Sequence, residues 1–153
     1  SVLLLQQCGE SNPEKQQAKQ NIRQAVDGFY TWFKNNRSAL TLVFNAQKPD
    51  SFLNRLKASG YTHAKLQTRL KEDIKQCYRQ NKSAQESALK KSCFPASEIV
   101  CADQTHRIVV QAVELKCQAA KVAVQNFGIE MQVNLNKSGK RWLITNVLCP
   151  KNQ

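Results

Sequence analysis

Hydrophobic and polar residues alternate one by one near the end of the chain. Single polar residues separate four apolar ones, which are Ile129, Met131, Val133 and Leu135. This period of two is typical of a β-strand that turns one apolar face toward a core. The pattern therefore predicts a β-meander over residues 121–149, whose apolar face the rest of the chain covers.

A return strand is expected after a turn. Gly139 accepts positive φ angles at low cost, so residues 138–139 are predicted to form a two-residue hairpin loop and residues 140–148 the return strand. The pairs expected from this loop are Leu135–Trp142, Val133–Ile144, Met131–Asn146 and Ile129–Leu148. Three of the four pairs are apolar on both sides, which favours this register.

The first part of the chain has helical periodicity. Asn12 is a candidate N-cap, and Pro13 fits a first helical turn. Apolar residues then recur on one broad stripe, which comprises Ala18, Ile22, Ala25, Val26, Phe29, Trp32 and Phe33. We expect this helix to end at residues 35–38 and its stripe to lie on the sheet. Gly28 costs about 1 kcal/mol inside a helix, which suggests that another element passes close to it.

Further helices and strands follow in order. Residues 39–44 are apolar and of uncertain type, whereas residues 52–58 predict a short helix that Gly60 ends. A longer helix opens at Thr62 or His63, and its buried stripe comprises Leu66, Leu70, Ile74, Cys77 and Tyr78. The polar residues 81–92 also favour helix. Strand patterns appear at 108–115 and 122–124, joined by a short connection at 117–120. Helices before strands predict an α+β fold with about four antiparallel strands.

The length of the chain indicates one domain, and its composition gives a strong positive charge. The chain has 153 residues and a net charge of +12, and we place a single domain at residues 11–153. Such a charge attracts polyanions but does not determine a fold. On the predicted third helix, a separate basic stripe comprises Lys71, Lys75, Arg79 and Lys82. It is predicted to be a docking strip for an acidic partner or an anionic surface; the alternative is a solvated helix face without a dedicated partner.

Cysteine content points to disulfides. The six cysteines are Cys8, Cys77, Cys93, Cys101, Cys117 and Cys149. None forms a Cys-x-x-Cys pair, and neither His63 nor His106 has zinc-site spacing, so no metal site is predicted. An even count favours disulfides in an oxidising compartment, and Cys93 and Cys101 bracket a Pro-containing loop that they could close. The pairing stays open, and buried thiols in a reducing compartment are the alternative.

Residues 1–10 precede the predicted domain. A short apolar run, Val2 to Leu5, comes shortly before Cys8. This order is similar to the end of a secretory or lipoprotein signal. We therefore expect a signal or lipoprotein remnant, or an N-terminal arm, with Cys8 as a site of lipidation or of a disulfide.

Catalytic motifs are not recognisable in the sequence. It has no Gly-rich phosphate loop, nucleophile elbow or metalloprotease helix, so we expect neither an enzyme nor a cofactor. An alternative is a small-molecule pocket between the first helix and the sheet, with Asp27, Tyr30 and Asn146 as its polar groups. Asp27 is otherwise an edge carboxylate, paired with Arg23 four residues earlier.

Three segments of the sequence stand out together, and they are residues 29–33 (FYTWF), residues 95–103 (PASEIVCAD), and residues 121–124 with 139–147. Together they resemble a family of bacterial envelope proteins of unknown function. That family is similar to the cystatin-like, or nuclear-transport-factor-two-like, α+β superfamily. The resemblance implies a long helix across a curved antiparallel sheet, with room for a cone-shaped pocket, and it carries no catalytic residues.

These features together predict a non-enzymatic, disulfide-stabilised protein of the periplasm or outer membrane of a Gram-negative bacterium. The expected partner is an acidic protein or an envelope polyanion, as for a toxin-neutralising or secretion-accessory protein. Nucleic acid ranks last, because the aromatic residues fit a core better than a base-stacking surface.

Overall fold

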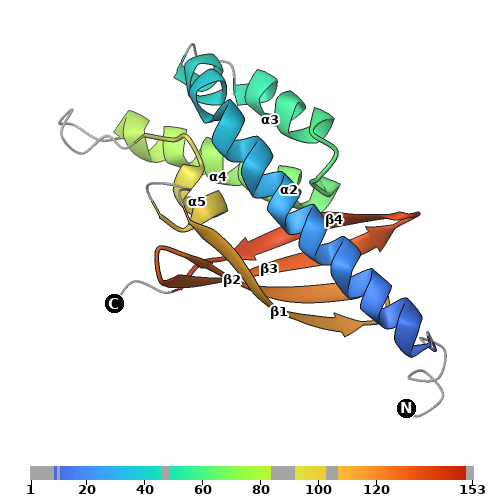
Figure 1. Cartoon of the computed structure of the whole chain (residues 1–153). Coiled ribbons are helices and arrows are strands. Elements are labelled where there is room, and N and C mark those ends of the chain that lie inside the picture. Colours follow the sequence, from blue (N-terminus) through green and yellow to red (C-terminus); the bar gives the residue numbers. More distant parts are fainter. Residues whose placement is uncertain (1–8, 10, 46–48, 84–91, 103–106, 151–153) are drawn as a thin grey trace.

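In the part of the chain that the structure describes, four helices precede four strands. The computed structural model describes residues 9, 11–45, 49–83, 92–102 and 107–150. Its elements are α2 (Asn12–Asn45), α3 (Pro49–Ala58), α4 (Ala64–Ser83), α5 (Ala96–Val100), β1 (Ile108–Lys116), β2 (Ala119–Asn126), β3 (Ile129–Ser138) and β4 (Arg141–Leu148). The strands form one antiparallel sheet in the order β1-β2-β3-β4, with α2 running across it (Figure 1). The predicted α+β fold class is confirmed.

The long helix α2 lays its aromatic stripe on the sheet. Phe29, Tyr30 and Phe33 are buried, and the Phe29 and Tyr30 rings meet edge to face at 5.0 Å. The helix begins with a cap from Ser11, whose Oγ accepts a bond from the Glu14 amide at 3.3 Å, rather than from Asn12 as the sequence predicted. The same stripe that the sequence predicted therefore covers the apolar face of the sheet.

The prediction that this helix ends at residues 35–38 is wrong, because α2 continues to Asn45. Leu40 and Phe44 are buried and extend the stripe by two more turns, so residues 39–44 are helical. A polar side chain in this added part of α2 bonds to the backbone of the helix itself. Thr41 Oγ1 donates to the Arg37 carbonyl oxygen at 2.8 Å, four residues back.

The hairpin exists, but its predicted register is wrong. Ser138 pairs with Arg141, so the two-residue loop is Gly139–Lys140, and Gly139 takes a φ of +62° at its first position. Leu135 pairs with Ile144 instead of Trp142. A bulge between Asn134 and Leu135 shifts the pairing, which places Asn146 opposite Asn134 and Val147 opposite Val133. The bulge lets Ile144 and Val147 both face the core, although they do not alternate.

A short segment between α3 and α4 covers the free edge of β4. The amide of Ile144 donates to the Tyr61 carbonyl at 2.8 Å, and the amide of His63 donates to the Ile144 carbonyl at 2.8 Å. These bonds protect the edge strand from pairing with another chain. They also bring Tyr61 against α2, where its hydroxyl lies 2.7 Å from the position a Cβ on Gly28 would occupy. The expected close approach at Gly28 is confirmed.

Two disulfides join the helical part to itself and to the sheet. Cys77 of α4 is bonded to Cys93, and Cys101 at the end of α5 is bonded to Cys149 after β4. The predicted Cys93–Cys101 loop closure is therefore wrong, whereas the prediction that cysteines form disulfides is confirmed. Cys117 is disulfide-bonded too. Residues 1–8, with Cys8 and the signal or lipoprotein prediction, lie outside the described residues.

Candidate functional site

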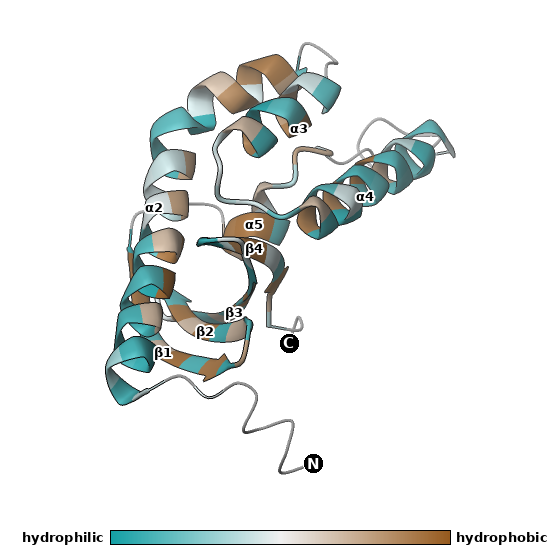
Figure 2. Cartoon of the chain, turned by 90° about the vertical axis from the view of Figure 1, so that its right-hand side faces the viewer, coloured by the Kyte–Doolittle hydropathy of each residue, from teal (hydrophilic) through white to brown (hydrophobic). Residues whose placement is uncertain are grey.

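The predicted basic stripe lies on the outer face of α4. Leu66, Leu70 and Ile74 turn inward and are buried, whereas the four cations are exposed. We call the exposed set the basic strip; it comprises Lys71, Lys75, Arg79 and Lys82. Its members lie three or four residues apart, so they follow one another along about 16 Å of helix. Figure 2 shows α4 extending away from the sheet, hydrophilic toward its far end.

Acidic neighbours neutralise the basic strip only in part. Lys75 Nζ lies 3.7 Å from Glu72 Oε1, and the two side chains are 50% and 62% exposed. Exposed pairs of this kind contribute little and exchange readily with other partners. Among the described side chains, no carboxylate lies within ion-pair distance of the other three cations, Lys71, Arg79 and Lys82. The basic strip thus remains a source of positive potential.

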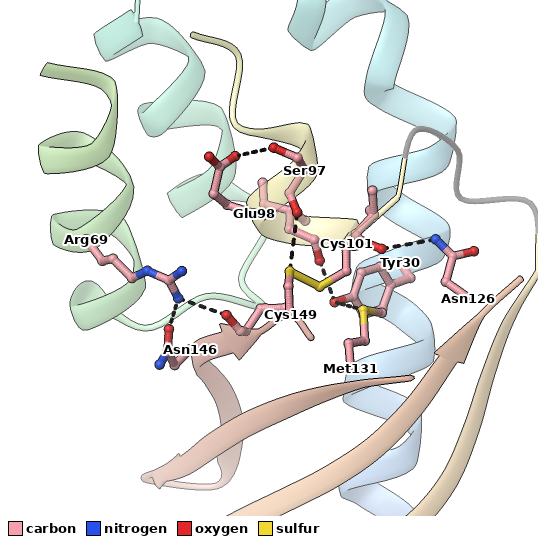
Figure 3. The surroundings of a disulfide bond; sticks show 12 residues. Tyr30, Arg69, Ser97, Glu98, Cys101, Asn126, Met131, Asn146 and Cys149 are labelled. Atoms are coloured by element: carbon pink, nitrogen blue, oxygen red, sulfur yellow. Dashed lines mark hydrogen bonds between the residues drawn. A yellow bond between two sulfur atoms is a disulfide. The ribbon is translucent and has the colours of Figure 1, made fainter. Parts of the chain in front are cut away.

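Arg69 fixes the first half of α4 on the sheet. Its Nη1 donates to Asn146 Oδ1 and, at 2.9 Å, to the carbonyl oxygen of Val147 (Figure 3). Its Nε lies 3.7 Å from Asp73. Burial raises the pKa of the Asp73 carboxyl, the positive charge of Arg69 opposes this, and the negative charge of Glu98 adds to it. Arg69 therefore serves as an anchor and not as a free member of the basic strip.

The second half of α4 is held by a covalent bond. The Cys77–Cys93 disulfide ties the helix to the segment that leads into α5, and Phe94 of that segment meets Phe44 and Phe52 edge to face. The helix is therefore fixed at Arg69 and at Cys77, on either side of Lys71 and Lys75. A fixed helix presents its charges in one geometry, which lowers the entropic cost of binding a partner.

The three residues predicted to line a pocket lie apart. Asp27 is exposed on α2, Tyr30 is buried, and Asn146 is half-buried on β4, where it accepts the bond from Arg69. Arg23 does not pair with Asp27, because its Nη1 donates to the Val110 carbonyl at 3.3 Å. Side chains of the core occupy the region between the aromatic stripe and the sheet. The structure thus brings together the basic strip but not the predicted pocket residues.

Tyr30 caps α5 instead of lining a site. Its hydroxyl donates to the Ile99 carbonyl oxygen at 2.8 Å, and Met131 Sδ lies 3.9 Å away (Figure 3). Asn126 Nδ2 donates to the next carbonyl, that of Val100, at 3.1 Å. The last carbonyls of a helix lack partners within the helix, so these two side chains satisfy them. The sequence did not reveal this role, because α5 and Tyr30 are distant along the chain.

The burial of Tyr30 predicts a loss of stability at alkaline pH. Burial raises the pKa of its phenol well above the usual range. An unfolded tyrosine ionises near pH 10, so above about pH 10 the unfolded state loses a proton that the folded state keeps. We expect the free energy of unfolding to hold below about pH 10 and to fall above it. Urea denaturation at about pH 8 and 11 tests this, and Tyr30→Phe should remove this contribution; an equal alkaline loss in both proteins contradicts it.

Comparison with protein-family models, curated proteins and solved structures finds no match to this chain. The resemblance to a cystatin-like envelope family therefore stays a prediction.

No helix in the described part of the chain is long and apolar enough to cross a membrane. The same residues contain no group of three side chains placed to hold a metal ion. His63 accepts a bond from the Lys65 amide at 3.0 Å, and His106 is outside the described residues.

Proposed function

We propose that this protein is a non-enzymatic, disulfide-stabilised binding protein of the bacterial envelope. The basic strip on α4 binds an acidic protein partner or an envelope polyanion. The observation that carries the proposal is the arrangement of the four cations on one exposed face of a helix that is fixed at two points. The disulfides support an oxidising compartment such as the periplasm.

An acidic protein is the favoured partner class. The basic strip extends along about 16 Å of helix, which matches a few turns of a partner helix or a short extended acidic segment. A long envelope polysaccharide would contact a basic track that continues over several elements, whereas the basic strip stays on one helix. Opposite charges at matched spacing would speed association and align the partner along α4.

Charge reversal of the basic strip should weaken binding to an acidic polypeptide. The variant Lys71→Glu/Lys75→Glu/Arg79→Glu is compared with the natural protein for binding to fluorescent poly-L-glutamate at low and moderate salt. We expect affinity to fall at least about tenfold, because attractive contacts become repulsive. Anionic phosphatidylglycerol vesicles, used in a parallel titration, stand for an envelope polyanion.

A matched control separates the basic strip from net charge. Lys15→Glu/Lys34→Glu/Lys137→Glu reverses three exposed lysines on α2 and β3 and changes the net charge equally. This control should retain most of the affinity for poly-L-glutamate. Equal losses in the two variants would remove the basic strip as a site and leave only a general effect of charge. The difference between the two variants is also measured with the vesicles. If that difference is larger with the vesicles than with poly-L-glutamate, the basic strip binds an envelope polyanion instead.

A further inference from the structure

A second polar site lies away from the basic strip, where three segments of the chain meet. Asn21 and Gln24 of α2 form one wall, and residues 59–61 form another. Lys140 of the β3–β4 turn and Arg141 at the start of β4 form the third. We call it the turn hollow. Its volume is about 360 Å³, within the range of roughly 300–1,000 Å³ that is typical of small-molecule sites.

Hydrogen bonds fix the wall of the turn hollow that residues 59–61 form. Tyr61 is held by its bond to the amide of Ile144 in β4. Ser59 Oγ is occupied within the loop, since it donates to the Leu56 carbonyl at 2.6 Å and accepts from the Tyr61 amide at 3.3 Å. Small-molecule sites need such fixed walls, because ordering them on binding would cost affinity.

Two glycines make room for the side chains of Arg141 and Tyr61, which line the turn hollow. Gly60 has a φ of +80°, and Arg141 Nη1 lies 3.0 Å from the position of a Cβ there. Gly28 lies inside α2, and the Tyr61 ring occupies the space its Cβ would take. A glycine inside a helix is unfavourable by about 1 kcal/mol relative to alanine. Gly28 therefore costs the helix some stability, but it leaves the space that the Tyr61 ring occupies.

The chemistry of the lining matches an anion that carries hydroxyl groups. Lys140 and Arg141 supply positive charge, and no carboxylate lines the turn hollow among the described residues. A guanidinium binds carboxylate or phosphate through two parallel hydrogen bonds. On the facing wall, Asn21 Oδ1 already accepts a bond from Gln17 at 3.0 Å, which leaves its NH₂ as a donor, and the Gln24 amide offers both a donor and an acceptor.

We propose that the turn hollow binds a sugar acid or a sugar phosphate. Arg141 and Lys140 hold the carboxylate or phosphate group, and the amides of Asn21 and Gln24 bond the hydroxyls. The side of Tyr61 offers an apolar surface for the ring. The two ligands share this chemistry and differ only in the anionic group. This site is independent of the basic strip, and either can exist without the other.

The test is a titration of the full, oxidised chain followed by amide chemical shifts. The probes are sodium galacturonate, glucose 6-phosphate and neutral galactose. We expect both anions to shift amides of residues 59–61 and 140–142, and galactose to bind at least about tenfold more weakly. Tighter binding of galacturonate assigns a carboxylate ligand, whereas tighter binding of glucose 6-phosphate assigns a phosphate.

Variants locate the anion in the turn hollow. Arg141→Gln should weaken binding of both anions at least about tenfold, because it removes the charge and the forked donors. Arg141→Lys keeps the charge, so it should retain part of the affinity. Binding by this variant would also show that a substitution at position 141 does not unfold the protein. Arg107→Gln removes an exposed arginine that lies outside both sites, so it should leave the affinity unchanged. Galactose binding as tightly as galacturonate, or equal affinities for Arg141→Gln and the natural protein, would overturn the proposal.

Discussion

Phe29→Ala is expected to lower the free energy of unfolding by about 3–5 kcal/mol, the range for removing a fully buried aromatic ring. Phe29 has no exposed surface, and its ring lies 5.0 Å from that of Tyr30 and 6.3 Å from that of Tyr61. It therefore touches α2 neighbours and the segment that covers β4. Alanine would leave a cavity between the helix and the sheet that these rigid rings cannot fill.

Urea denaturation, followed by the fluorescence of Trp32 and Trp142, measures this loss. Leu42→Ala is the matched control, because Leu42 lies on the same helix with 71% of its surface exposed. The control should change the free energy of unfolding by no more than about 0.5 kcal/mol. A similar small effect for both substitutions would mean that α2 does not hold the core together.

Removal of the Cys101–Cys149 disulfide is expected to cost about 4 kcal/mol, mainly because it frees the unfolded chain. The two cysteines are 48 residues apart, so their bond closes a loop that contains the whole sheet. The bond also attaches the end of β4 to α5, whose last carbonyls Tyr30 and Asn126 satisfy (Figure 3). The double variant Cys101→Ser/Cys149→Ser leaves the other cysteines unchanged.

The second disulfide provides the comparison. Cys77 and Cys93 are 16 residues apart, so Cys77→Ser/Cys93→Ser should cost about 3 kcal/mol by the same loop-closure argument. Urea denaturation of the two double variants ranks the effects. A larger loss for the shorter loop, or no loss for the longer one, would show that loop closure does not govern the contribution of these bonds.

Periodicity along the chain was enough to predict the layers of the fold. The stripe that contains Phe29 and Phe33 depends only on residues three and four positions apart, and the alternation in β3 depends only on next-but-one neighbours. Both patterns are local, so the sequence displays them directly. Gly28 was informative for the same reason, because a glycine inside a helical stripe is costly without a close neighbour.

Register, helix length and disulfide pairing could not be predicted in the same way. The bulge between Asn134 and Leu135 depends on how Ile144 and Val147 both reach the core, which is a property of the packed sheet. The end of α2 depends on the burial of Phe44 against Phe52, and the Cys101–Cys149 bond depends on the path of the whole sheet. These features require the tertiary structure.

Of the two candidate sites, one could be predicted from a local pattern and the other required the tertiary structure. The basic strip lies on a single helix, so the spacing of Lys71, Lys75 and Arg79 predicted a common face. The turn hollow combines Asn21, Tyr61 and Arg141 from three segments that only the fold brings together. Its single sequence signal was Gly28, which indicated a close approach but not a site.

The most direct test of the proposed function is to map an acidic polypeptide on the folded protein. Amide chemical shifts of the full chain are followed as unlabelled poly-L-glutamate is added, and a spin-labelled form locates it by line broadening. We predict that the largest changes fall on residues 71–82 of α4 and that salt reverses them. Changes spread evenly over the basic surface, or centred on another element, would contradict the assignment of the basic strip as the binding site.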